Sequence, residues 1–88
     1  MKTVFADQAW EDYLHWQAAD PNTLERVNEL IKECKRSPFK GIGKPEPLKG
    51  DLQGWWSRRI NTVDRLVYRV TGTGHAQALE IAQCRFHY

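Results

Sequence analysis

Apolar positions follow a helical period in the first part of the chain and alternate with polar ones in the last part. The short, β-prone stretch Lys2–Phe5 predicts a first strand. Helical spacing over Asp7–Ala19 predicts a first helix, with Asp7 as its N-cap. An acidic cap followed by proline at Asp20-Pro21 predicts the start of a second helix.

The second helix is expected to end at Ser37-Pro38. Its apolar stripe consists of Leu24, Val27, Leu30, Ile31 and Cys34. Cations near its C-terminal end suit the helix dipole, and contact with phosphate is the alternative role for Lys32, Lys35 and Arg36. Two helices joined by a tight link form a hairpin. Neither helix can bury its stripe alone, so the hairpin is expected to cover a sheet.

Three later stretches alternate as strands do: Trp55–Ile60, Arg65–Val70 and Gln77–Phe86. Residues 39–54 precede them as a long loop, and a loop of this length in a small domain usually carries function. We therefore expect one α+β domain over residues 1–88. In it an N-terminal strand and a two-helix hairpin accompany a small, mostly antiparallel sheet.

Charge is distributed unevenly along the chain. Residues 1–31 hold two basic and six acidic side chains, a net −4, whereas residues 32–88 hold eleven basic and five acidic ones, a net +6. A basic half suggests contact with a polyanion, and the alternative is a solvated face. The two cysteines, Cys34 and Cys84, lack metal-site spacing, so no zinc site is expected. No cofactor is expected for the chemistry considered below. No signal peptide or membrane-spanning stretch is recognised, which makes the cytoplasm the expected compartment.

Lys44–Lys49 places one carboxylate, Glu46, between two prolines and between two lysines. Proline fixes its own φ and restricts the residue before it, so Glu46 lies on a stiff segment. A carboxylate held in place can act as a general base. Taken alone, these six residues favour the simpler interpretation, a rigid surface loop with a solvated glutamate.

The remaining candidates are groups that RNA cleavage by the substrate's own 2′-hydroxyl would use. Such a reaction needs a base, cations for the phosphate and an acid for the leaving 5′ oxygen. Glu46 is the candidate base and His87 the candidate acid, because imidazole titrates near neutrality. Tyr88 could stack on a base or donate its hydroxyl. The candidate phosphate ligands are Arg65, Arg59, Arg58, Lys49 and Lys44.

Each candidate also has an ordinary alternative. Arg65 could pair with Asp64 or Glu80, and only one of the adjacent Arg58 and Arg59 can face a given side of a strand. A His-Tyr chain end is usually frayed.

Taken together, the motifs resemble the YoeB/Txe toxins of the RelE superfamily. They are Ser37-Pro38-Phe39-x-Gly-x-Gly-Lys-Pro-Glu-Pro-Leu-Lys49, Leu52-x-Gly54-x-Trp56-Ser57-Arg58-Arg59-Ile60, Arg65-Leu66-Val67-Tyr68 and Cys84-Arg85-x-His87-Tyr88. The likeness covers nearly the whole chain and implies the RelE-like, microbial-ribonuclease-type fold.

The resemblance also implies a function. Members are toxins of bacterial type II toxin–antitoxin systems that enter the 70S ribosome and cut mRNA in the A site without a metal. Carried over by position, Glu46 matches the general base, Arg65 the phosphate-stabilising arginine and His87 the general acid. Tyr88 matches the C-terminal tyrosine, and Lys49 and Arg59 match further active-site cations.

The implied partners are a YefM-type antitoxin and, for some members, a second copy of the toxin. Operator DNA would be contacted only through the toxin–antitoxin complex.

Two features depart from the family pattern. Asp64 stands where the family usually has histidine, which puts a negative charge beside Arg65. The Thr71–Gln77 turn is also longer than expected.

Two other functions stay open at this point: a toxin that binds a protein target such as gyrase, and a non-catalytic RNA- or ribosome-binding module. A domain this small has few walls to position RNA, so a cleft completed by a partner surface is expected.

Overall fold

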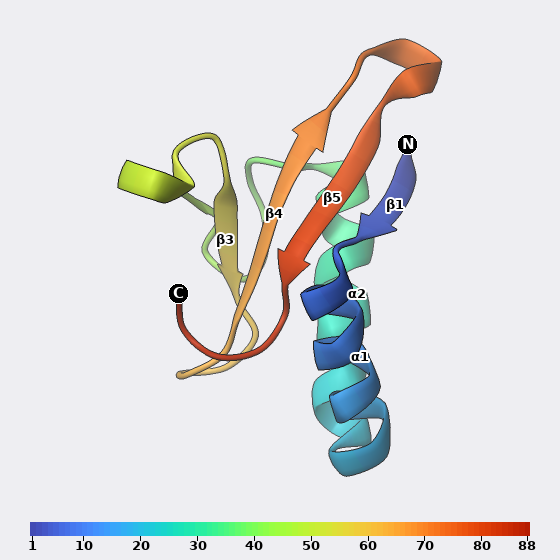
Figure 1. Cartoon of the computed structure of the whole chain (residues 1–88), viewed down its shortest axis with the longest axis vertical. Helices are drawn as coiled ribbons and strands as arrows, with labels where there is room; N and C mark the ends of the chain where they lie inside the picture. The colour runs from blue at the N-terminus through green and yellow to red at the C-terminus, as the bar shows by residue number, and fades with distance from the viewer.

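Two helices cover one face of a five-stranded mixed sheet, and no helix covers the other face (Figure 1). The computed structural model describes residues 1–88. The sheet order is β1-β5-β4-β3-β2, with β1 parallel to β5 and every other pair antiparallel. The elements are β1 (Lys2–Phe5), α1 (Asp7–Ala19), α2 (Pro21–Arg36), β2 (Glu46–Pro47), β3 (Trp56–Arg59), β4 (Arg65–Thr71) and β5 (Ala78–Gln83). The predicted α+β class, with a helix hairpin on a mostly antiparallel sheet, is confirmed.

The helix hairpin follows the local signals closely. The Asp20 carboxylate accepts hydrogen bonds from Thr23 N at 3.2 Å and from Thr23 Oγ1 at 2.7 Å, which caps α2 and lowers the pKa of Asp20. The predicted cap of α1 is wrong by one residue. Ala6 is the N-cap, in extended backbone, and Asp7 is the first helical residue, where its charge suits the helix dipole.

The core lies between α2 and the central strands. Val27 and Leu30 of α2 are fully buried against Leu66 and Tyr68 of β4 and the apolar residues of β5. Residues two apart on a strand share a face, so Leu66 and Tyr68 both point toward the helices. Val67, between them, belongs to the opposite, helix-free face.

β5 ends three residues earlier than the alternation predicts. At Cys84 the backbone leaves the sheet and is bound by α1: Asp12 Oδ2 accepts from Cys84 N at 3.0 Å, and Trp16 Nε1 donates to Cys84 O at 2.8 Å. Residues 84–88 then curve back past β4 toward β3 (Figure 1). We call residues 84–88 the tail.

The long loop also contains structure. It carries the two-residue strand β2 and a 3-10 helix at Gly50–Leu52, and a second 3-10 helix, Gly74–Ala76, lies in the turn before β5. No helix of the molecule is both long enough and apolar enough to cross a membrane.

Candidate active site

The strand register places the candidate residues on the helix-free face. Glu46 of β2 is paired with Ser57 of β3, Ser57 with Val67 of β4, and Arg59 with Arg65. Directly paired residues, and residues two apart on a strand, share one face of a sheet. One carboxylate and two guanidinium groups therefore project from the same side of three adjacent strands.

Glu46 is exposed on a segment anchored at both ends. Before it, Gly43 O accepts from Arg59 N at 2.7 Å; after it, Leu48 N donates to Trp55 O at 2.9 Å. Gly43 has φ +82, and a Cβ there would lie 2.8 Å from Leu30 Cδ2. Only glycine lets the loop approach α2 this closely. The carboxylate is thus positioned by backbone contacts, as the two prolines predict.

Arg65 is largely buried, and carbonyl groups of the preceding turn hold its guanidinium. Nη1 donates to Asn61 O at 2.8 Å and to Asp64 O at 3.1 Å, and Nη2 donates to Thr62 O at 3.4 Å. These three bonds leave two of the five guanidinium N–H groups without a protein acceptor. The guanidinium of Arg65 is therefore fixed in position and still has two N–H groups that could donate to a ligand.

No carboxylate neutralises Arg65. Glu80, one of the two partners considered from the sequence, instead pairs with Arg69 at 2.8 Å, and this hydrogen bond lowers the pKa of Glu80. The carboxylate of Asp64, the other, is bound elsewhere and forms no ion pair with Arg65. The positive charge is therefore available to an external anion.

The tail contacts the same side of the sheet through Phe86 and Tyr88. Phe86 N donates to Asp64 Oδ1 at 2.7 Å, and Phe86 O accepts from Arg65 N at 3.0 Å. Beyond it, the hydroxyls of Tyr88 and Ser57 are 3.4 Å apart. The rings of His87 and Tyr88 stack with centroids 4.7 Å apart. These contacts bring Phe86 to Arg65 and Tyr88 to Ser57, the strand partner of Glu46. The exposed His87 instead lines a hollow beside α1, and no contact joins it to Glu46 or the arginines.

Arg58 does not belong to this site. Its side chain is fully buried on the helix-facing side, and its guanidinium donates to Tyr68 Oη at 3.1 Å, Ile42 O at 3.0 Å and Lys40 O at 3.0 Å, and also to Ser37 O. The expectation that Arg58 binds phosphate is corrected on this ground, because every partner is internal. Its neighbour Arg59 is exposed on the opposite face, as strand alternation requires.

Lys44 and Lys49 are exposed at either side of Glu46 and form no ion pair. They contribute positive charge to the surroundings of the carboxylate. The structure holds neither ammonium group in a fixed contact.

Two residues near the site were missed from the sequence. Ser57 lies between Glu46 and Val67 in the register and contacts Tyr88. Ser57 is two residues from Arg59 in the predicted strand, so alternation alone could have placed it on the same face as the candidate arginine. Asp64 binds the tail through its carboxylate; the sequence showed only that it departs from the family pattern.

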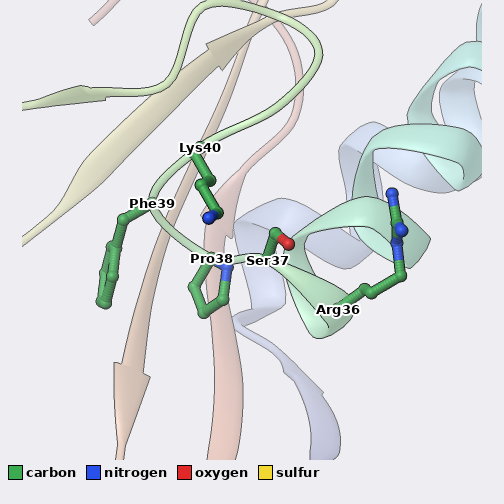
Figure 2. Close-up of a pocket in the computed structure, with 5 residues that line it drawn as sticks. All are labelled: Arg36, Ser37, Pro38, Phe39 and Lys40. Atoms are coloured by element: carbon green, nitrogen blue, oxygen red, sulfur yellow. The ribbon is translucent and has the colours of Figure 1, made fainter.

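The site is an open surface rather than a cavity. One hollow of about 350 Å³ is lined by Arg36–Lys40 at the end of α2, where Figure 2 shows Phe39 and Arg36 on opposite sides of the segment. A second, of about 260 Å³, lies between α1 and the tail and is lined by Gln8, Asp12, Gln83, Arg85, Phe86 and His87. Neither includes Glu46, Arg59 or Arg65. No group of three or more His, Cys, Asp or Glu side chains is placed to hold a metal ion.

Known structures first define the class of fold. YafQ from Escherichia coli superposes with a TM-score of 0.71 over 98% of this chain and 92% of that one, at 18% identity, which shows that the two chains share a fold. Residues 5–88 match the model of the YoeB-like toxins of bacterial type II toxin-antitoxin systems, and the chain belongs to this family.

Full-length relatives agree with this assignment. Toxin YoeB of Escherichia coli K12 is 51% identical over 88 residues, all of both chains. The YoeB/ParE toxin from Agrobacterium tumefaciens has a TM-score of 0.97 at 56% identity, with all of both chains covered. YoeB from Staphylococcus aureus, solved as a dimer and as a heterotetramer with YefM, has a TM-score of 0.88 at 43% identity, covering all of this chain and 98% of that one.

Proposed function

We propose that this toxin is a ribosome-dependent endoribonuclease that cleaves mRNA in the ribosomal A site and so stops translation. The observation that carries the proposal is the placement of Glu46, Arg59, Arg65 and Tyr88 on one open sheet face. A carboxylate beside two arginines without carboxylate partners suits a substrate that offers both a proton and a phosphate.

In the proposed reaction, Glu46 removes the proton from a 2′-hydroxyl of the message. The 2′ oxygen forms a bond to the adjacent phosphorus, and the bond from phosphorus to the 5′ oxygen breaks. His87 protonates that leaving oxygen, so the products are a cyclic phosphate and a 5′-hydroxyl. The chemistry consumes no water in this step and uses no metal.

The arginines would stabilise the charge that develops on the phosphate. Arg65 suits this role because the turn carbonyls fix its guanidinium while two N–H donors stay free. Preorganised donors of this kind are effective because they need not reorganise during the reaction. Arg59, Lys44 and Lys49 add positive charge nearby, and Tyr88 can stack on a base or donate its hydroxyl.

The absence of walls around the face supports a requirement for the ribosome. Positioning is a large part of the rate of a phosphoryl transfer, and an open face positions a flexible message poorly. We therefore propose that the 70S ribosome supplies the opposing surface, and that free RNA is cut weakly.

The proposed partners are argued from a relative of known structure. Because the Staphylococcus aureus relative forms both a dimer and a complex with YefM, we propose a YefM-type antitoxin and a homodimeric free form for this toxin. Operator DNA would be contacted only through the antitoxin complex. The bacterial cytoplasm, where ribosomes translate, would be the site of action.

A primer-extension map of one mRNA in a purified translation system tests the proposal. Wild type, Glu46→Gln and Glu25→Gln would be compared with and without ribosomes; Glu25 is an exposed carboxylate of α2 and serves as control. We expect a ribosome-dependent cut at the A-site codon that only Glu46→Gln loses. No cut with any form, combined with toxicity in cells, would reject the proposal in favour of a protein target.

A further inference from the structure

Asp64 joins three parts of the candidate site that are separate in sequence. Its Oδ1 accepts from Phe86 N at 2.7 Å, and its Oδ2 accepts from Asn61 Nδ2 at 2.9 Å. Its main-chain carbonyl accepts from Arg65 Nη1 at 3.1 Å. We infer that Asp64 is a positioning residue, whose carboxylate holds the tail that carries His87 in register with the turn that holds Arg65. This inference rests on the proposed function.

The turn before β4 depends on the same carboxylate. Asn61 Oδ1 accepts from the amides of Val63 at 2.8 Å and Asp64 at 2.7 Å, so the side-chain oxygen of Asn61 is fully used. The amide nitrogen of Asn61 then has Asp64 as its acceptor. This closed turn presents three carbonyls to the guanidinium of Arg65.

The tail has few anchors, which makes the contact from Asp64 important. Upstream, α1 holds Cys84 through Asp12 and Trp16, and Gln83 Nε2 donates to Arg85 O at 3.0 Å. Downstream, the remaining contact to the sheet is the 3.4 Å approach of the Tyr88 and Ser57 hydroxyls.

Between these two points, the hydrogen bonds of Phe86 go to residues 64 and 65, and the Arg85 guanidinium lies over its ring, 4.4 Å from the centroid. Phe86 has φ 66, in the left-handed region. A non-glycine residue in that region is retained where its surroundings hold it. Without the Asp64 carboxylate, Phe86 N–H would lose its acceptor one residue before His87.

A general acid must lie within hydrogen-bond reach of the oxygen it protonates. A displacement of about 1 Å can lower a rate by about 10²-fold. Loosening the tail should therefore lower the cleavage rate without removing any group that reacts. Binding to the ribosome should change little, because no basic side chain is removed.

The kinetic test compares Asp64→Ala, Asp64→Asn and the control Asp51→Ala under single-turnover conditions on programmed ribosomes. Asp51 is exposed in the 3-10 helix after Lys49 and makes no side-chain hydrogen bond or ion pair. We expect Asp64→Ala to lower the maximal cleavage rate by about 10- to 100-fold with little change in half-saturating toxin concentration. Asp64→Asn, with one acceptor oxygen left, should lose less. A maximal rate unchanged in Asp64→Ala would overturn the inference.

A double-mutant cycle separates positioning from general stability. If Asp64 acts through His87, Asp64→Ala should reduce the residual rate of a His87→Ala variant much less than it reduces the wild-type rate. Equal fold-losses in both backgrounds would mean that Asp64 acts independently of the acid, which would overturn the inference.

Hydrogen exchange at the Phe86 amide gives a readout that needs no activity. We expect faster exchange in Asp64→Ala and unchanged exchange in Asp51→Ala, at a temperature where both variants are folded. Unchanged exchange in Asp64→Ala would remove the structural basis of the inference. A wild-type protein that cuts no message would instead reject the proposed function, whatever the exchange shows.

Discussion

Arg59 and Arg65 lie directly opposite one another across β3 and β4, although both are cations and neither has a carboxylate partner. Like charges in directly paired positions destabilise a sheet. The fold therefore retains a locally unfavourable pair on the face that we propose binds phosphate. An anion placed between the two guanidinium groups would relieve this repulsion.

Replacing Arg59 should stabilise the protein while lowering the proposed cleavage activity. We expect Arg59→Thr to raise the free energy of unfolding by about 0.2–1 kcal/mol, because a β-former replaces a repelling charge. Urea denaturation measures the first effect and the translation assay the second. Arg69→Thr is the control: that arginine pairs with Glu80, so its loss should not stabilise. A less stable Arg59→Thr protein would contradict the prediction.

Replacement by lysine should reduce stability far more at Arg58 than at Arg59. Arg58→Lys leaves several buried carbonyls without donors, and we expect it to lower the free energy of unfolding by about 2 kcal/mol or more. Arg59→Lys, at an exposed position, should change stability by less than about 0.5 kcal/mol. Equal urea midpoints for the two variants would show that the buried guanidinium contributes nothing specific.

Gly43 and Gly54 test how the loop before Glu46 is held. Both have positive φ, but only Gly43 is crowded, with Leu30 and the Arg58 Cβ within 3.1 Å of an added Cβ. Gly54→Ala should cost about 1–2 kcal/mol from its backbone conformation alone. Gly43→Ala should cost more and should also lower cleavage, because the loop must move away from α2. Thermal unfolding and the cleavage assay are the measurements, and a milder effect at residue 43 would be the contrary result.

Stability should fall as pH rises above 9. Burial raises the pKa of the Cys34 thiol from 9.0 to about 11, that of Cys84 from 9.0 to about 12 and that of Tyr68 from 10.0 to about 12. Between pH 9 and 12 the unfolded chain therefore releases protons that the folded chain keeps, so the slope of stability against pH is negative.

Urea midpoints from pH 8 to 10.5, under reducing conditions, measure this decline. The Cys34→Ala, Cys84→Ala double variant should show a shallower decline, since only Tyr68 remains of the three groups. A midpoint independent of pH in the wild type would contradict the prediction.

Local sequence signals were sufficient to predict the helix hairpin. The end of β5 was not predicted, because it depends on long-range contacts. Asp20 and Pro21 define the start of α2 within a few residues, so the sequence predicts that boundary correctly. The end of β5 depends instead on Asp12 and Trp16, about 70 residues earlier, which bind Cys84. No periodicity near Cys84 reveals those partners.

The same distinction applies to the site. Alternation correctly predicts that Arg58 and Arg59 lie on opposite faces, but it does not say which face the helices cover. Arg58 is buried because backbone carbonyls of residues 37–42 satisfy its guanidinium, and that contact depends on the tertiary fold. The role of Asp64 depends in the same way on an amide 22 residues later.

The position of β5 determines the order in which strands can pair while the chain is being synthesised. β5 lies between β1 and β4, so residues 2–5 have no strand partner until residues 78–83 emerge. The β3–β4 hairpin, with both paired arginines, can form earlier but lacks the tail that carries His87. A nascent chain therefore contains the paired arginines before it contains His87, the proposed acid. Premature termination would release a fragment that has an unpaired strand edge and lacks the tail. We expect proteases to degrade such a fragment before it can act as a toxin.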